Sequence, residues 1–458
     1  MKQLLPHQLE DAAFLAARTF AGNFSGMGSG KTLTALEAIR LVDDQDGYVV
    51  IIGPPISLSM WKKEVEEYLG MRAQIVRKGS EKLRFPDVAV FIMSYQIATK
   101  RRDELREFNI LALICDESHA LKSISAKRTK AIIGRHGICE SARYTWLLSG
   151  TPSTKYSDDL FSFLCRADAA GMKERVGKVD MSRFRLRYCI TQKKKFSGHQ
   201  RFPIEVVVGN RNTAELNEWL FDGGLAVRHE LKTVFEQMPP LTINHLQVQL
   251  DSDPELRRML KSMETQTMAQ IKEDVANKEE HISTLRRKLG RAKVKHSVTE
   301  IVDRVEAGVW PLLVGAIHHD TIDLLAKTLR DKDINVAVID GRTSAPRRED
   351  AVSAFNKGTI DILVGQIQAM GVSLNLQGGS HIICVETTFS PAEQDQFYAR
   401  CHRIGQANHV HVDVFEAADV KLEKAIRRIL ATKARGHATL MEQSTKTPSP
   451  HRSIVEGA

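Results

Sequence analysis

The chain has 458 residues, of which 42% are hydrophobic and 26% charged, the balance of a soluble globular protein with room for two or three domains. No run approaches the ~18 apolar residues that cross a bilayer, which excludes a membrane-spanning helix. The formal net charge of +9 favours a polyanionic partner, and six cysteines without a Cys-x-x-Cys pair predict reduced thiols in a cytoplasmic protein.

The first residue of interest is Gln8, just ahead of an apolar, helix-like stretch at residues 9–17. Its amide could hydrogen-bond the edge of an adenine. An ordinary solvent-facing glutamine is the alternative, and nothing in these residues alone decides between them.

A glycine-rich loop follows, and its three glycines let the backbone fold tightly round a polyphosphate with the amide groups directed at the anion. Lys31 would reach the outer phosphates, and the hydroxyl of Thr32 would hold Mg²⁺ at the start of a helix expected over 33–41. A chance turn is the alternative for so short a motif. The residues expected to contact the nucleotide here are Ser25, Gly26, Met27, Gly28, Ser29, Gly30, Lys31 and Thr32.

From residue 47 onward, short apolar runs alternate with amphipathic helical stretches such as 59–69. Fully apolar strands between such helices predict a parallel sheet covered on both faces. The expected strands are 48–52, 88–93, 110–115 and 144–148.

Acidic residues follow the third of these strands, at the edge of a parallel sheet where ligands gather. Asp116 can ligate Mg²⁺ there, and Glu117 can orient and deprotonate a water molecule. A surface turn of acidic residues is the alternative. The next strand ends in Ser149, Gly150 and Thr151, whose hydroxyls could relay the nucleotide state to another surface.

Polar helix signals with few strands occupy residues 158–307. Two basic clusters lie within them, and each would attract a phosphate backbone by counterion release. Around the first cluster, the aromatic residues are expected to pack rather than stack on bases; a solvated helix face is the alternative for the second. The clusters comprise Arg183, Arg185, Arg187, Lys193, Lys194, Lys195 and Arg201, then Arg286, Arg287, Lys288, Arg291, Lys293 and Lys295.

Strand and helix signals alternate again from residue 311, which predicts a second doubly wound sheet without a phosphate loop. Ser390 can cap a helix that begins at Pro391. Counted along that helix, one face carries Gln396, Arg400 and Arg403. Two arginines on one face suit delivery across a cleft to a transferring phosphoryl group, with a solvated basic face as the alternative.

Taken together, these motifs resemble those of the superfamily-two helicases, in the Swi/Snf-related DNA translocase family and closest to its annealing-helicase branch. The resemblance runs from Leu5 to about Leu430. It implies that Gly371 and Gln396 contact the nucleotide, and that His119 and Arg228 belong with residues 149–151 to the elements that couple ATP to movement. Its motifs are Leu5-Pro6-His7-Gln8, residues 25–32, 116–120 and 149–152, Val227-Arg228-His229, Met238-Pro239-Pro240, residues 340–343 and 369–376, and residues 400–406.

This resemblance implies an α/β fold of two tandem RecA-like lobes, each a doubly wound parallel sheet, with helical insertions between them. The expected boundaries are 1–240 for the first lobe with a protrusion from about 158, 241–308 for a helical linker, 309–436 for the second lobe and 437–458 for a flexible tail. A chain with the motor alone would suit a phage or mobile element, in which case the compartment is the host cytoplasm.

The implied function is an ATP-dependent DNA translocase, with ATP and Mg²⁺ as cofactors, double-stranded or forked DNA as partner and a monomer as the expected state. In this hypothesis Lys31, Asp116, Glu117, Arg400 and Arg403 carry the chemistry. A strand-separating DNA or RNA helicase is one alternative. A nucleotide-gated DNA scaffold with vestigial hydrolysis is the other.

Overall fold

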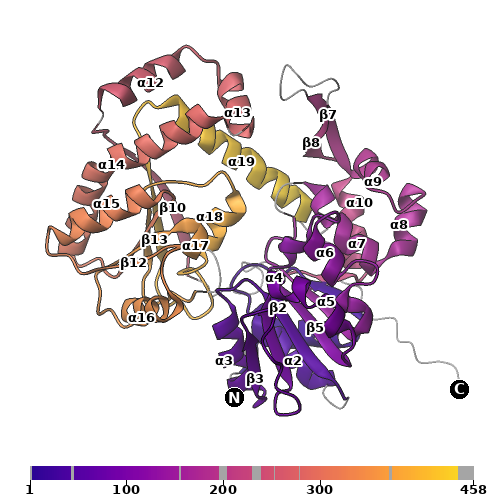
Figure 1. Ribbon diagram of the computed structural model, residues 1–458. Coiled ribbons are helices and arrows are strands. Elements are labelled where there is room, and N and C mark those ends of the chain that lie inside the picture. The colour runs from indigo at the N-terminus through magenta and orange to yellow at the C-terminus, as the bar shows by residue number, and fades with distance from the viewer. Residues whose placement is uncertain are drawn as a thin grey trace, which may run out of the picture.

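The structure is a computed structural model that describes residues 3–42, 46–153, 156–194, 204–229, 239–251, 253–277, 279–370 and 374–441. Two parallel sheets organise these residues, and each is covered by helices on both faces (Figure 1). We call the first sheet with its helices the first lobe and the second sheet with its helices the second lobe. The predicted fold class is confirmed.

The first lobe is built on a seven-stranded sheet in the order β3-β4-β2-β5-β6-β1-β9, in which every pairing is parallel. Alternate residues of β2 enter opposite cores: Val49 and Ile51 face α1, α2 and α3, whereas Val50 and Ile52 face the layer that contains α4 to α7. The strands are β1 (Phe20–Asn23), β2 (Tyr48–Gly53), β3 (Ala73–Val76), β4 (Val90–Ser94), β5 (Ile110–Asp116), β6 (Ala142–Leu148) and β9 (Ala226–Val227).

Three helices of the first lobe, α1, α2 and α3, lie where the apolar periodicity predicts helical stretches, each beginning one to three residues earlier than expected. The stretch expected over 33–41 is part of α2, and the stretch expected over 59–69 is α3. The helices are α1 (Pro6–Ala16), α2 (Lys31–Val42), α3 (Leu58–Tyr68), α4 (Tyr95–Lys100), α5 (Arg102–Arg106), α6 (Lys127–Ile132), α7 (Phe161–Ala167), α8 (Ala169–Val176), α9 (Met181–Tyr188) and α10 (Thr213–Asn217), with the short turns η1 (Ser118–Leu121), η2 (Ile138–Ser141), η3 (Ser157–Leu160) and η4 (Glu218–Asp222).

The second lobe is built on a six-stranded sheet in the order β10-β15-β14-β11-β13-β12, also parallel throughout. Helices α14 and α15 cover one face, and α16, α17 and α18 cover the other. The strands are β10 (Leu241–Val248), β11 (Leu312–Ala316), β12 (Val336–Ile339), β13 (Ile362–Gln366), β14 (His381–Cys384) and β15 (Val410–Ala417), and the helices are α14 (Glu280–Glu306), α15 (His319–Arg330), α16 (Ala345–Asn356), α17 (Ile367–Met370) and α18 (Pro391–Tyr398).

The helical linker expected over 241–308 does not begin at residue 241. Residues 241–248 form β10, the edge strand of the second sheet, paired along its whole length with β15. Most of its side chains are exposed, because an edge strand is covered on few sides, so the residues lack the apolar run that marks a buried strand. The second half of α14 also packs directly on the second sheet, through Val294, Val298 and Ile301.

A helical layer and a hairpin complete the described chain. The hairpin pairs β7 (Cys189–Lys194) with β8 (Ile204–Asn210) in antiparallel fashion, within a segment expected to hold few strands. Helix α19 (Lys421–Met441) packs with α12 (Pro254–Glu264) and α13 (Met268–Asn277) and continues to α10 and β8 of the first lobe (Figure 1). One long helix therefore joins the two lobes. Among the described residues, no helix combines the length and apolarity that membrane crossing requires.

Candidate active site

The glycine-rich loop connects the end of β1 to α2, which begins at Lys31. Gly28 and Gly30 have φ of 80° and 84°, a region that favours glycine. The Lys31 ammonium lies inside the loop and donates to the carbonyl oxygens of Ser25 (2.8 Å) and Gly26 (2.9 Å). Burial lowers the pKa of Lys31 to about 8, although the carboxylates of Glu117 and Asp116 oppose this shift.

Gln8 supports the loop from behind. Its Nε2 donates to the carbonyl oxygen of Ser29 at 3.0 Å, and its Oε1 accepts the backbone amide of Leu5 at 2.9 Å. A Cβ added to Gly30 would lie 2.0 Å from Gln8 Nε2, so a side chain here would displace the flexible Gln8 amide from the loop, while the φ of 84° itself favours glycine. The structure thus places Gln8 beside the loop, and its role with an adenine stays a prediction.

The two acidic residues stand at the carboxyl end of β5, beside the loop. Trp61 Nε1 donates to Asp116 Oδ2 at 2.8 Å, and the Glu117 amide donates to Asp116 Oδ1 at 3.0 Å. Burial and the charge of Glu117 raise the pKa of Asp116 to about 6. Burial also acts to raise the pKa of Glu117, but the adjacent His119, at 3.2 Å, holds it below its usual value. The pair therefore divides into one carboxyl that gains a proton easily and one that stays ionised.

Backbone geometry singles out Glu117. Its φ and ψ are both 50°, the left-handed region that residues with a side chain seldom adopt. Such strain is found where the surrounding fold over-determines a functional residue. Here it occurs at the abrupt transition from β5 to η1, which carries His119.

The segment after β6 lies directly against the loop. A Cβ on Gly150 would meet Met27 Cγ at 2.6 Å and Lys31 Nζ at 3.5 Å, so the segment approaches the loop as closely as its glycine allows. The Thr151 amide donates to Ser149 Oγ at 3.1 Å. Movement of the loop would therefore displace residues 149–151.

Two predicted arginines converge in the second lobe. Nη1 of Arg400 and Nη1 of Arg403 both donate to the carbonyl oxygen of Leu374, at 3.3 and 3.2 Å, and Arg400 Nε donates to the carbonyl oxygen of Gln396 at 2.9 Å. Burial lowers the pKa of Arg403, and it lowers the pKa of Arg400 to about 10. The buried Arg400 and the partly buried Arg403, both on one carbonyl, leave an excess of positive charge in this part of the lobe.

Their expected arrangement on one helical face is wrong. Ser390 does cap α18, since its hydroxyl accepts the Glu393 amide at 3.4 Å, and Pro391 opens the helix. The helix then ends at Tyr398, and a turn carries Arg400 and Arg403. Beyond the helix, the Arg400 carbonyl oxygen accepts the distant Leu376 amide instead of continuing the helical pattern. The residues near Tyr398 contain no glycine or proline from which this end could be predicted.

The charged groups of the two lobes act on each other. Glu117 and Asp116 hold the pKa of Arg400 higher than burial alone would, and Arg400 in turn lowers the pKa of Lys31. The arginine of the second lobe thus lies within electrostatic range of both carboxylates and of the loop lysine of the first. Gly371, also predicted to contact nucleotide, lies outside the described residues.

In the second sheet the equivalent crevice is filled by the protein itself. The strand order reverses between β11 and β14, which in an open sheet is the place for a ligand. The Glu386 carboxylate lies there and accepts the amides of Ile317 (2.8 Å) and His318 (3.0 Å), while His318 Nδ1 lies 2.7 Å from its other oxygen. A fixed carboxylate in this position excludes an anionic ligand.

The donors and hydroxyls of the first lobe suit a nucleoside triphosphate with Mg²⁺. Within the described chain, Ser29 Oγ in the loop and Thr151 Oγ1 beside it are buried without a hydrogen-bond partner. Such orphaned hydroxyls are costly unless a ligand satisfies them. Thr32 and Asp116, the predicted metal ligands, offer hydroxyl and carboxylate oxygens, the ligand types that Mg²⁺ prefers.

Sequence reasoning missed Trp61, Asp11 and Asn23 as members of this site. Trp61 orients Asp116, and Asp11 and Asn23 belong to a polar network under the loop. A polar residue within the apolar face of α1 was the available signal for Asp11, since Ala12 and Leu15 beside it are buried. Arg228, predicted as a coupling residue, donates to the Phe24 carbonyl oxygen at 2.9 Å and so braces the strand that enters the loop.

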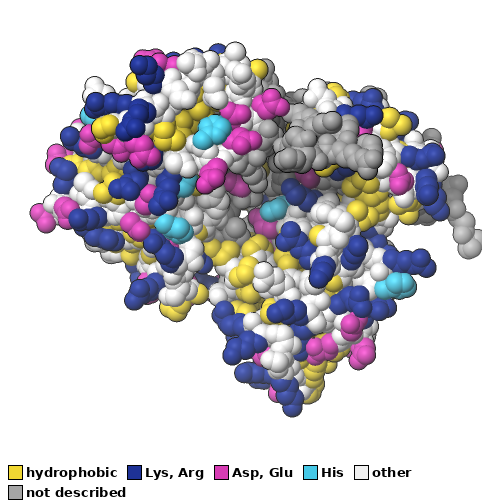
Figure 2. All heavy atoms as spheres, turned by 45° about the horizontal axis from the view of Figure 1, so that its top comes forward, with side chains coloured by type: hydrophobic (Ala, Val, Ile, Leu, Met, Phe, Trp, Pro, Cys, Tyr) yellow, Lys and Arg dark blue, Asp and Glu magenta, His cyan; other side chains and the backbone are white. Residues whose placement is uncertain are grey.

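The basic clusters are largely engaged within the protein. Arg185 is bonded to Asp158 at 2.9 and 2.7 Å, and Arg187 to Glu215 in a two-pronged pair at 3.0 Å, while Arg183 and Lys193 are exposed. In the second cluster, nearly buried Lys293 is bonded to Glu423, Arg286 lies over Phe389, and Arg287 and Lys288 form ion pairs. Figure 2 shows Lys and Arg scattered over the visible face rather than gathered in one patch. Lys195 and Arg201 lie outside the described residues.

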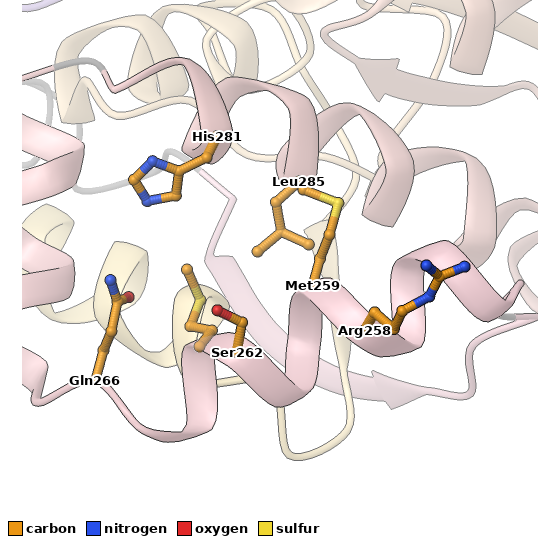
Figure 3. Close-up of a pocket in the computed structure, with 7 residues that line it drawn as sticks. Arg258, Met259, Ser262, Gln266, His281 and Leu285 are labelled. Carbon is orange, nitrogen blue, oxygen red and sulfur yellow. The ribbon is translucent and has the colours of Figure 1, made fainter.

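A hollow of about 410 Å³ lies between α12 and α14, away from the loop (Figure 3). Met259, Leu285 and Ser262 line it, with Gln266 and His281 at one end. Its lining includes no residue of the loop or of the arginine turn, so it does not belong to the candidate active site.

Comparison with known proteins identifies the fold family. Residues 23–175 match the SNF2-related domain, and residues 312–405 match the helicase conserved C-terminal domain. The chain belongs to the SNF2-related helicases. The two matched regions contain the phosphate loop with its carboxylates and the arginine turn, respectively, so each half of the candidate site falls in a different SNF2-related helicase domain.

Several curated SNF2-related proteins are similar over about nine-tenths of the chain. A Caenorhabditis elegans homolog of the SWI/SNF-related matrix-associated actin-dependent regulator of chromatin subfamily A-like protein 1 is 26% identical over 90% of the chain and 58% of its own length. Chicken DNA repair and recombination protein RAD54B is 24% identical (89% and 51%), and human DNA annealing helicase and endonuclease ZRANB3 is 24% identical (90% and 38%). The chain thus spans about half the length of these relatives. A solved Sulfolobus solfataricus SWI2/SNF2 ATPase core in complex with dsDNA covers 97% of this chain and 98% of its own, at 17% identity and a TM-score of 0.43.

Proposed function

We propose that the protein is an ATP-dependent DNA translocase that hydrolyses ATP between its two lobes. The observation that carries the proposal is the electrostatic interaction of Arg400 with Glu117, Asp116 and Lys31. A site completed by groups from both lobes makes hydrolysis depend on how the lobes lie relative to each other. Movement of one lobe against the other can then be coupled to the chemistry.

The residues of the first lobe bind and position the reactants. The loop amides and Lys31 hold the phosphates at the start of α2. Thr32 and Asp116 would hold Mg²⁺, which when bound neutralises charge on the phosphates. Glu117, ionised and aimed by its strained backbone, orients the attacking water and accepts its proton. Trp61 keeps the Asp116 carboxylate in place for its ligand.

Arg400 and Arg403 stabilise the charge that develops on the transferred phosphoryl group. Their shared hold on the Leu374 carbonyl oxygen links them to the segment that precedes β14, so a change in this segment would reposition both. On the other side, residues 149–151, His119 and Arg228 touch the loop, its carboxylate or its strand, and can pass the nucleotide state onward. We propose the boundaries 1–240 and 309–436 for the lobes, with β10 and the second half of α14 added to the second.

DNA is the proposed track, because the relatives named above include proteins of DNA repair and recombination and of DNA annealing. A basic chain with a net charge of +9 supports binding of a polyanion. We propose that a monomer in the cytoplasm acts on double-stranded or forked DNA, in replication, repair or recombination. Membership of the annealing-helicase branch and a phage origin stay predictions.

The test is the ATPase rate with no DNA and with single-stranded, duplex and forked DNA. Stimulation by duplex or forked DNA, together with displacement of a triplex strand without unwinding of the duplex, is the expected result. Unwinding of tailed duplexes would favour a strand-separating helicase instead. ATP binding with negligible turnover on every DNA would favour a nucleotide-gated scaffold, and a rate indifferent to DNA would overturn the translocase.

A further inference from the structure

A buried carboxylate under the phosphate loop is not used by the chemistry above. Asp11 lies on α1 and is 2% exposed. Its Oδ2 accepts hydrogen bonds from Asn23 Nδ2 (3.1 Å) and Ser25 Oγ (3.2 Å), and its Oδ1 lies 2.9 Å from Nε2 of His229. A carboxylate is expensive to bury, so its partners must hold it firmly.

One partner, His229, is also bonded to the loop through its backbone. Its amide donates to Ser25 Oγ at 3.1 Å, and its carbonyl oxygen accepts the amide of Gly26, the first glycine of the loop, at 2.8 Å. Ser25 Oγ donates to Asp11 and accepts from the His229 amide, so it links these two residues in addition to their direct side-chain contact. Asp11, Ser25 and His229 form a closed ring of hydrogen bonds under one end of the loop.

His229 also stands where the chain leaves the first lobe. It follows β9, which pairs with β1, the strand that enters the loop. The chain re-enters the described structure at Pro239 and Pro240, whose carbonyl oxygens are bonded to His402 and to the Val410 amide of the second lobe. The ring thus joins the loop to the beginning of the connection between the lobes.

The charge on Asp11 has a specific effect on His229. The hydrogen bond that His229 donates to Asp11 raises the pKa of His229, because the carboxylate stabilises the imidazolium, while burial opposes the shift. The His7 ring, 5.6 Å away, and Glu10 also face this imidazole. A neutral amide at position 11 would keep an acceptor oxygen and lose this ion pair.

We propose that Asp11 is a positioning residue that, through His229, makes the phosphate loop and the start of the inter-lobe connection respond to nucleotide as one unit. The inference rests on the proposed function. It adds a second route, independent of Arg400, by which a nucleotide-induced change in the loop is transmitted to the second lobe. If Asp11 only stabilised the first lobe, its replacement would lower stability but would not alter whether a nucleotide-induced change in the loop reaches the start of the inter-lobe connection.

Hydrogen exchange without DNA tests this route. A non-hydrolysable ATP analogue is added to the full chain, and exchange is followed in a peptide of the loop and in one covering residues 224–229. In the wild type both should exchange more slowly with the analogue. In Asp11→Asn the loop peptide should still slow, whereas the 224–229 peptide should not. DNA-stimulated kcat should fall about tenfold, with KM for ATP within about twofold.

Matched variants control for folding and for loss of any histidine–carboxylate pair. Glu416→Gln removes a pair of the same kind, His245 to Glu416 at 2.7 Å, from the second lobe, and should behave as the wild type in both peptides. His229→Gln, which leaves α1 intact, should reproduce the split, and combining it with Asp11→Asn should add nothing further.

Other outcomes separate the two ideas. If both peptides of Asp11→Asn slow as in the wild type, or if only KM rises, Asp11 merely shapes the loop and the inference is overturned. If the wild-type loop peptide does not respond to the analogue at all, the proposed nucleotide site fails first, and this inference with it.

Discussion

Burial lowers the pKa of Arg400 in the second lobe to about 10, and the charge of Glu117 in the first lobe opposes this shift. Burial acts to raise the pKa of Glu117, and Arg400 is among the cations that together hold it below its usual value. Arg400 is buried and donates to carbonyl oxygens of its own lobe, so the carboxylates across the lobe boundary bring negative charge into its surroundings. Each lobe therefore carries one half of a shared charge arrangement. A triphosphate placed between them would supply further negative charge close to this arginine.

Replacement of Arg400 therefore should affect chemistry more than binding. Arg400→Ala should lower DNA-stimulated kcat about a thousandfold with little change in nucleotide affinity, because an arginine that stabilises the transition state acts late. Arg400→Lys should recover little, since an ammonium cannot reproduce the guanidinium fork. Steady-state ATPase assays and a nucleotide-binding titration measure the two effects. Arg427→Ala, which removes an exposed arginine paired with Glu416, is the matched control and should keep full activity.

Glu117 should show opposite effects on stability and on activity. Glu117→Gly relieves a left-handed backbone and should stabilise the first lobe by about 1 kcal/mol while hydrolysis is lost. Glu117→Gln should also lose hydrolysis, by a factor of about 10²–10⁴, without that gain. Thermal unfolding monitored beside the ATPase rate compares them. Equal unfolding temperatures for the two variants would contradict strain at this position.

Two effects of replacing Gly30, the contact of a new side chain with Gln8 and the strain of a positive φ, can be measured separately. Gly30→Ala should weaken nucleotide binding, because the φ of 84° disfavours alanine and the new methyl group, 2.0 Å from Gln8 Nε2, would push this flexible side chain away from the loop. Gly70 has φ of 67° with nothing within 4 Å of an added Cβ, so Gly70→Ala should cost about 1 kcal/mol and leave binding intact. Binding of a fluorescent nucleotide distinguishes the two. Partial rescue of Gly30→Ala by Gln8→Ala would identify the collision itself.

Nucleotide affinity should fall at alkaline pH. Burial lowers the pKa of Lys31 to about 8 in the free protein, so above this pH a growing fraction of the lysine is neutral. Phosphates favour its charged form, and the affinity should therefore be flat below pH 8 and decline about tenfold per pH unit above it. Titration of a non-hydrolysable analogue between about pH 7 and about pH 10 measures this. Lys31→Arg keeps its charge over that range, and a decline that persisted in it would assign the effect to another group.

Replacement of exposed basic residues should weaken DNA binding more than replacement of basic residues that form ion pairs within the protein. Arg183→Ala with Lys193→Ala should weaken duplex binding and reduce the dependence of log Kd on log salt by about 0.9 for each phosphate that the variant no longer neutralises. Arg187→Ala should instead act mainly on stability, since it removes the cation that pairs with Glu215. Binding isotherms at several salt concentrations provide the slopes. An unchanged slope in the double variant would place the DNA elsewhere.

Much of the fold can be predicted from the sequence because buried parallel strands appear in it as continuous apolar runs. The runs at 48–52 and 110–115 coincide with β2 and β5 to within a residue. Strands that lack such a run could not be predicted this way: β10 is exposed on an edge, and β9 has only two residues. Hairpin β7–β8 is also largely exposed, so its residues lack the pattern of a buried strand.

The candidate site divides along similar lines. The loop and the acidic pair could be predicted because each is a contiguous motif, and the acidic pair also follows an apolar strand. The place where α18 ends could not, because the Arg400 carbonyl oxygen and its Nη1 are bonded to residues 376 and 374, which are distant in the sequence. The pairing of Asp11 with His229 escaped prediction for the same reason: 218 positions separate the two residues that meet.

The position of Glu386 predicts how many nucleotides one chain binds. Its carboxylate already satisfies the amides at the crevice of the second sheet, so a second triphosphate would have to displace a charge of its own sign. One chain should accordingly bind a single equivalent of nucleotide, although it contains two sheets of closely related design. The two lobes are therefore chemically unequal: the first offers amides and a lysine to a polyphosphate, and the second offers a carboxylate at the corresponding place.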